Sequence, residues 1–128
     1  MAVTGVALGA NMSVMVKRAY EEAARSDGER ILVDRLWPRG LTKAKAQIDI
    51  WLKDVAPSTE LRQWFDHDPE KWPEFQKRYR AELRKNPALS ELEARSRRGN
   101  VTLVYAARDQ VHNEALVLKK LLDRGASR

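Results

Sequence analysis

The chain contains no cysteine, and this absence excludes several kinds of chemistry. Disulfide scaffolds, thiolate zinc sites, iron–sulfur clusters and cysteine nucleophiles all require thiols. Glycine is also sparse, with six residues in 128, and neither a Walker loop nor a dinucleotide-binding Gly-x-Gly-x-x-Gly motif occurs. The motifs Gly-x-Ser-x-Gly and His-Glu-x-x-His are missing too. The sequence therefore argues against P-loop NTPases, nicotinamide enzymes, serine hydrolases and zincins.

Long apolar runs are absent as well, since no segment approaches the roughly 18 residues of a membrane span. We therefore expect a soluble, cytoplasmic protein that does not contact membranes. Residues 1–12 are small and weakly apolar, but they lack the positive charge that begins a signal peptide, which favours a flexible tail. The length fits one domain. We place this domain at residues 13–124, followed by a C-terminal tail at 125–128, and the sequence does not indicate an oligomeric state.

Positive charge is in excess, with 24 Lys and Arg residues against 18 Asp and Glu residues and a net charge of +6. An excess of this size is compatible with nucleic acid, an anionic membrane or a phosphorylated small molecule as partner. It does not choose among them.

Strand-like and helical segments alternate along the chain. A continuous apolar run at 101–105 is typical of a central strand that is buried on both faces. Other extended segments are expected at 14–16, 31–33 and 48–55. Helices are expected at 59–65, from Pro69 or Pro73 to Leu83, after Asn86-Pro87, and after Asp109. This order predicts an α/β fold with a mostly parallel open sheet flanked by helices, as in Rossmann-like domains.

In such sheets ligands bind outside the carboxyl ends of the strands, which makes the loop after Val33 a candidate site. This loop carries Asp34, Arg35, Trp37 and Arg39. Guanidinium groups grip phosphate or carboxylate, and an indole can stack on a planar base. The simpler interpretation is an Arg–Asp ion pair beside a tryptophan that fills a corner of the core.

The loop after Tyr105 is the second candidate, because Arg108, Asp109, His112 and Asn113 cluster where the last helix should begin. A helix N-terminus favours anions, and Arg108 would add a full charge. His112 is the best general acid or base by its intrinsic pKa. The simpler interpretation makes Asp109 an N-cap and His112 a surface residue, and capping is compatible with a role in a site.

Two further features are weaker. His67 lies between Asp66 and Asp68, but adjacent side chains rarely point the same way, so we predict no metal site there. Basic residues on the middle helices could contact phosphates, which keeps nucleic acid possible as a partner without favouring it. These basic residues are Lys77, Arg80, Arg84, Arg95, Arg97 and Arg98.

A string of motifs in fixed order is more specific. It consists of Val33-Asp34-Arg35-Leu36-Trp37-Pro38-Arg39-Gly40, Trp51-Leu52-Lys53, Trp64-Phe65-x-His67-Asp68-Pro69, Trp72-x-x-Phe75, Arg78-Tyr79, and Val104-Tyr105-Ala106-Ala107-Arg108-Asp109 with His112-Asn113. Between about residues 14 and 122, the chain resembles the YeaO-like family, a bacterial and archaeal domain of unknown function. The resemblance implies no established activity, but it covers both candidate loops.

The resemblance also sets two limits. Some family members are labelled uroporphyrin-III C-methyltransferase, but this chain is short for such an enzyme and has no Gly-rich cofactor loop. Related branches resemble this one but carry cysteines in the region of 105–113. Any chemistry of those cysteines is missing here.

Our leading hypothesis is a small α/β enzyme, or a former enzyme fold retained for binding, that takes a phosphate-bearing or nucleotide-like ligand. Asp34 or His112 would move protons, and no cofactor is identified. The alternative is a nucleic-acid or protein-binding module that uses the basic helical face. The predicted ligand-binding residues are Arg35, Trp37, Arg39, Lys53, Tyr105, Arg108 and Asn113.

Overall fold

The computed structural model describes residues 13–126, so the tail expected at 1–12 lies outside the described residues. The strands are β1 (Val14–Arg18), β2 (Glu29–Leu32), β3 (Ile50–Trp51) and β4 (Val101–Tyr105). The α-helices are α2 (Lys43–Ala46), α3 (Thr59–Phe65), α4 (Trp72–Leu83), α5 (Pro87–Arg98) and α6 (Glu114–Ala126). Short 3-10 turns are η1 (Arg25–Asp27), η2 (Lys53–Val55) and η3 (Pro69–Lys71).

Within the described residues, the strands form one four-stranded parallel sheet in the order β1-β4-β2-β3. Val14 of β1 pairs with Val101 of β4, and Leu103 of β4 pairs with Ile31 of β2. All five residues of β4 are buried. The prediction of a central strand at 101–105 is therefore confirmed, and so is the α/β fold with an open parallel sheet and flanking helices.

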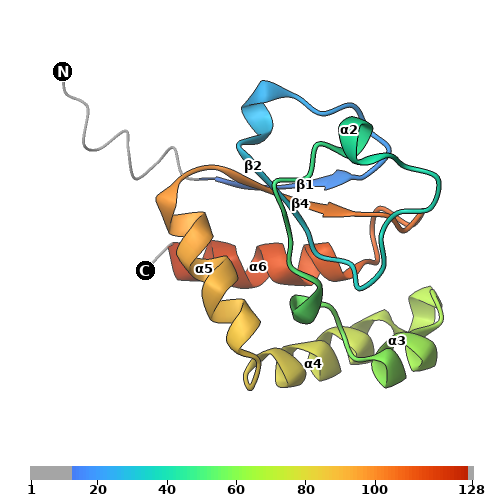
Figure 1. Cartoon of the computed structure of the whole chain (residues 1–128). Helices are drawn as coiled ribbons and strands as arrows, with labels where there is room; N and C mark the ends of the chain where they lie inside the picture. Colours follow the sequence, from blue (N-terminus) through green and yellow to red (C-terminus); the bar gives the residue numbers. More distant parts are fainter. Residues whose placement is uncertain (1–12, 127–128) are drawn as a thin grey trace.

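The two faces of the sheet are covered differently (Figure 1). Helices α5 and α6 lie against one face, with α3 and α4 beyond them, while α2 lies on the opposite side. Successive side chains of a strand point to opposite faces of the sheet. Ile31 and Leu103 belong to the main core on one face. Their neighbours Leu32 and Val104 belong to a smaller cluster on the other face. That smaller cluster packs against Trp37 and other loop side chains.

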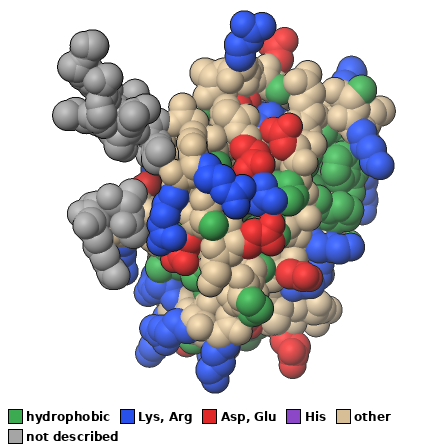
Figure 2. All heavy atoms as spheres, turned by 60° about the vertical axis from the view of Figure 1, so that its left-hand side comes forward, with side chains coloured by type: hydrophobic (Ala, Val, Ile, Leu, Met, Phe, Trp, Pro, Cys, Tyr) green, Lys and Arg blue, Asp and Glu red, His purple; other side chains and the backbone are tan. Residues whose placement is uncertain are grey.

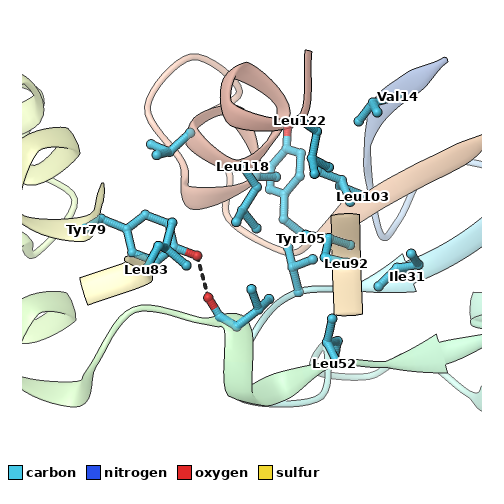
Figure 3. Close-up of a cluster of buried hydrophobic side chains, with 14 of the residues drawn as sticks. Val14, Ile31, Leu52, Tyr79, Leu83, Leu92, Leu103, Tyr105, Leu118 and Leu122 are labelled. Carbon is cyan, nitrogen blue, oxygen red and sulfur yellow. Dashed lines mark hydrogen bonds between the residues drawn. The ribbon is translucent and has the colours of Figure 1, made fainter. Parts of the chain in front are cut away.

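The helical stripe of α4 fills the main core (Figure 3). Phe75, Tyr79 and Leu83 are each 2% exposed or less. The hydroxyl of Tyr79 donates a hydrogen bond of 2.6 Å to the carbonyl oxygen of Val55. This bond satisfies a buried polar group and ties α4 to the turn that follows β3.

Side-chain caps set the starts of α3 and α5. Ser58 accepts the N–H of Leu61, and Asn86 accepts the N–H of Ala88. The extended segment expected at 48–55 is shorter than predicted, because only Ile50–Trp51 pairs with β2 and the chain then turns at η2. This turn brings Val55 fully into the core.

A buried ion cluster holds the amino-terminal end of the sheet together. Asp27 lies 2.6 Å from the Arg30 guanidinium and 3.0 Å from the Lys17 ammonium. The hydroxyl of Thr102 donates to the Asp27 carbonyl, and Arg30 also donates to the carbonyl of Ala46. Asp27 and Arg30 are each 3% exposed. The cluster therefore joins η1, α2 and three strands through charged groups that are shielded from water.

No helix within residues 13–126 is both long and apolar enough to cross a membrane.

We predict that Asp27→Asn destabilises the protein by about 3–5 kcal/mol at pH 7, because Arg30 would be left buried without its carboxylate. Burial raises the pKa of Asp27, but hydrogen bonds from Ala24, Lys17 and Arg30 outweigh it and lower this pKa below its ordinary value. The stabilisation is therefore present above the pKa of the unfolded state, about 3.9, and is lost as pH falls through the folded-state pKa.

Urea unfolding of the parent and of Asp27→Asn at several pH values checks this prediction. The difference in unfolding free energy between the two proteins should shrink as the pH is lowered toward 3. An equal difference at every pH would show that the carboxylate charge contributes nothing.

Candidate functional site

A cavity of about 710 Å³ lies at the carboxyl ends of β1, β2 and β4. Both loops singled out in the sequence line it. The α3 region and α4 complete its wall. The lining residues are Arg18, Asp34, Arg35, Leu36, Trp37, Pro38, Arg39, Ala56, Pro57, Arg62, Phe65, His67, Phe75, Ala106, Ala107, Arg108, Asp109, His112, Asn113 and Glu114.

Two of the predicted site residues lie elsewhere. Lys53 is outside the lining, and its ammonium group sits 4.9 Å from the centre of the Trp51 ring. Tyr105 is 3% exposed and belongs to the main core. The other predicted residues are brought together around the cavity, namely Asp34, Arg35, Trp37, Arg39, Arg108, His112 and Asn113.

Asp34 ties the ends of two neighbouring strands to each other. It lies two residues after β2, and its Oδ2 accepts a 2.9 Å hydrogen bond from the backbone N–H of Ala106, just after β4. Its carbonyl oxygen accepts the indole N–H of Trp51 at 2.7 Å. One hydrogen bond therefore holds the carboxyl group of Asp34 and the other holds its backbone, both at the cavity.

Trp37 is anchored at its polar edge. Its indole N–H donates to the carbonyl oxygen of Leu41 at 2.6 Å, and its ring meets Trp51 edge-on at 5.6 Å between centroids. The ring is partly buried in the smaller cluster, and it also lines the cavity. Trp37 thus combines the packing role of the simpler interpretation with a position at the candidate site.

Five arginines line the cavity, and within residues 13–126 none of them lies within ion-pair distance of a carboxylate. Arg18 donates to the carbonyl oxygen of Ala107 at 2.9 Å. Arg35 donates through Nη2 to the carbonyl oxygen of Pro57 at 3.2 Å, and its buried Nε has no hydrogen-bond partner among the described residues. The Arg–Asp ion pair of the simpler interpretation is therefore not formed by Arg35. These five arginines outnumber the three carboxyl groups that line the same cavity, which are Asp34, Asp109 and Glu114.

His112 is oriented by Asp109. One oxygen of Asp109 accepts the backbone N–H groups of Val111 and His112, and the other lies 2.9 Å from Nδ1 of His112. These hydrogen bonds, the one from the His112 ring foremost, lower the pKa of Asp109. The imidazole also meets the ring of Trp72 edge-on at 5.4 Å. The ring is thus held in one orientation beside the cavity.

The last helix begins later than the sequence suggested. The prediction that it follows Asp109 directly is wrong, because α6 begins at Glu114 and the side chain of Asn113 accepts the N–H of Leu116. Asp109 instead closes the preceding turn. Val111, which precedes the helix, is 64% exposed.

Glu114 is a site residue that the sequence reasoning missed. As the first residue of α6 it turns toward the strand ends, where its side chain is hydrogen-bonded to that of Asp34. Burial raises the pKa of Glu114 well above its usual range, and the hydrogen bond and the negative charge of Asp34 raise it further. Glu114 therefore keeps its proton to a higher pH than an ordinary glutamate does.

Arg18, Arg62 and His67 also line the cavity but were not predicted as site residues. Arg18 is the last residue of β1, so the rule that ligands bind at the carboxyl ends of parallel strands could have identified it. Arg62 and His67 come from the α3 region, which no local motif connects to the sheet. His67 is exposed, and no group of three or more potential metal ligands occurs in the part of the chain that the structure describes.

We predict that Glu114→Gln becomes more stable relative to the parent as pH rises. A carboxyl whose folded-state pKa is raised contributes stability fully below its unfolded pKa, about 4.3. This contribution is lost as pH rises through the folded-state pKa, whereas glutamine mimics the protonated form at every pH.

Thermal or urea unfolding of both proteins between pH 4 and pH 9 measures this difference. The relative stability of Glu114→Gln should rise from about pH 4 upward and then level off. A difference that does not change with pH would mean that Glu114 titrates normally.

Comparison with known proteins places these features in a family. The uncharacterized protein Rv3073c of Mycobacterium tuberculosis is 47% identical over 110 residues, which cover 86% of this chain and 93% of the relative. The uncharacterized protein YeaO of Escherichia coli is 42% identical over 108 residues, which cover 84% of this chain and 94% of the relative. No solved structure gives a significant match. The resemblance to YeaO-like proteins is thus confirmed.

A family model described as the inactive DUF488-N3 subclade matches residues 13–128. This match covers both candidate loops, all four strands and α6. The chain therefore belongs to the DUF488-N3i family.

Proposed function

We propose that the protein binds a phosphate-bearing or nucleotide-like small molecule in the cavity at the strand ends. The observation that carries this proposal is the set of five arginines around one cavity, none of them ion-paired to a carboxylate among residues 13–126. The five guanidinium groups outnumber the three carboxyl groups of the same lining, so this cavity would attract an anion. Guanidinium groups offer planar, bidentate donors that match phosphate oxygens.

The size and the walls of the cavity fit this ligand class. Small-molecule pockets typically measure about 300–1,000 Å³, and this one is about 710 Å³. Its apolar lining includes Trp37, Phe65 and Pro57, which can pack against a sugar or a base. Charged groups at the wall would fix the anionic end of the ligand.

We propose binding without turnover as the main role. The description of the DUF488-N3i subclade as inactive supports this choice. Asp34 and His112, the predicted proton-transfer groups, are both engaged with other groups of the cavity wall, Asp34 with Glu114 and His112 with Asp109. In a binding protein these two contacts would hold the side chains of the cavity wall in place.

The alternative, a nucleic-acid or protein-binding module, has weaker support. Arg95, one of the basic residues proposed for it, is ion-paired with both Glu29 and Glu91. Figure 2 shows a face on which Lys and Arg side chains are interspersed with Asp and Glu side chains. An interspersed surface attracts a polyanion less strongly than a continuous basic stripe does.

We predict that ribose 5-phosphate raises the melting temperature of the parent protein and that Arg39→Ala reduces this increase to about half. A ligand at 100 times its dissociation constant stabilises the folded state by about 2.7 kcal/mol, or several degrees for a domain of this size. Arg39 is exposed and lines the cavity, so its truncation should leave folding intact while weakening binding by about tenfold.

Lys53→Ala and Arg97→Ala are matched controls, because each removes one exposed positive charge outside the cavity lining. Both should bind ribose 5-phosphate as the parent does. Equal weakening in all three variants would indicate a diffuse effect of net charge and would contradict a site at this cavity. Binding of RNA or DNA that falls steeply with salt and is weakened only by Arg97→Ala would favour the alternative.

A further inference from the structure

The cavity contains a pair of carboxyl groups that the anion-binding proposal does not use. Asp34 comes from the end of β2, and Glu114 comes from the first turn of α6. Both line the cavity, and their side chains are hydrogen-bonded to each other. A site built only for phosphate would gain nothing from two acidic groups among its arginines, since they would repel the ligand.

The contacts of this carboxyl pair define what it can offer to a ligand. The charged group that acts most directly on Glu114, besides Asp34, is Arg62 on α3, and it forms no ion pair with Glu114. One oxygen of Asp34 accepts the N–H of Ala106. The lone pairs that remain can only accept hydrogen bonds, and both side chains are partly accessible to solvent.

The same cavity is also lined by aromatic and apolar side chains. Phe65 and Phe75 stack on each other at 4.3 Å between centroids, and both line the cavity. Trp37 and Pro57 belong to the same lining. Planar surfaces of this kind favour a planar heterocycle over a flexible chain or a bare phosphate.

We propose that the Asp34–Glu114 pair recognises the N–H edge of a guanine-type base, belonging to the ligand whose phosphate the cavity arginines hold. The inference rests on the proposed function and adds the identity of the base. A guanine edge presents the ring N1–H and the exocyclic amino group side by side, which matches adjacent carboxyl oxygens. A hypoxanthine edge keeps only the ring N–H.

Calorimetric titration with three phosphates tests the proposal on the full chain at neutral pH. Guanosine 5′-monophosphate should bind the parent at least about tenfold more tightly than ribose 5-phosphate, since each hydrogen bond to a charged acceptor contributes on this scale. Inosine 5′-monophosphate, which lacks the exocyclic amino group, should lie between them.

Glu114→Ala removes one acceptor of the pair and should abolish the preference for guanosine 5′-monophosphate. Its affinity for ribose 5-phosphate should stay the same or rise, because an acidic group is lost. Glu114→Gln keeps an acceptor oxygen and can still donate an N–H to Asp34, so it should retain most of the preference. It also controls for folding, which the same titration with ribose 5-phosphate checks.

The outcomes separate the two proposals. Equal binding of guanosine 5′-monophosphate and ribose 5-phosphate by the parent would overturn the base-recognition proposal alone. A preference that survives in Glu114→Ala would do the same. If neither compound binds the parent, the proposed function itself fails.

Discussion

The parallel sheet is the constraint on which the rest of the structure depends. Because every strand runs in the same direction, the segments that follow β1, β2 and β4 all emerge at the same end of the sheet, where the carboxyl ends of the strands lie. Arg18, Asp34 and Ala106 are separated widely in sequence, yet they meet there. Burial of β4 on both faces fixes this arrangement, since its apolar side chains must be covered by helices on one side and by loop residues on the other.

Charge is distributed unevenly around that sheet. At the amino-terminal end, the buried carboxylate of Asp27 is paired with both Arg30 and Lys17. At the carboxyl end, arginines surround a cavity without ion-paired partners in the described part of the chain, and the acidic groups there pair with each other or with His112. The charged groups at one end of the sheet are therefore paired and mostly buried, whereas the arginines at the other end have no ion-pair partner among the described residues.

Most of the fold could be predicted from the sequence because local patterns agreed with it. The apolar run at 101–105 and the caps at Ser58 and Asn86 are local signals, and the structure uses all three. The residues of the candidate site were harder to predict from the sequence than the fold. Asp109 and Asn113 are both residue types that cap helices, so the sequence alone does not show which of them precedes the helix. Because the helix begins only after Asn113, Glu114 is its first residue and faces the strand ends. Arg62 reaches the cavity only through tertiary packing, for which no sequence pattern exists.

Lys53 shows how a motif residue can matter away from the cavity. The strand β3 forms one edge of the sheet and pairs over only two residues, and Trp51 on it is 37% exposed. The Lys53 ammonium lies over that indole. Short edge strands bearing lysine are poor templates for the addition of a strand from another molecule. This edge is therefore protected against aggregation by the same residues that mark the family motif Trp51-Leu52-Lys53.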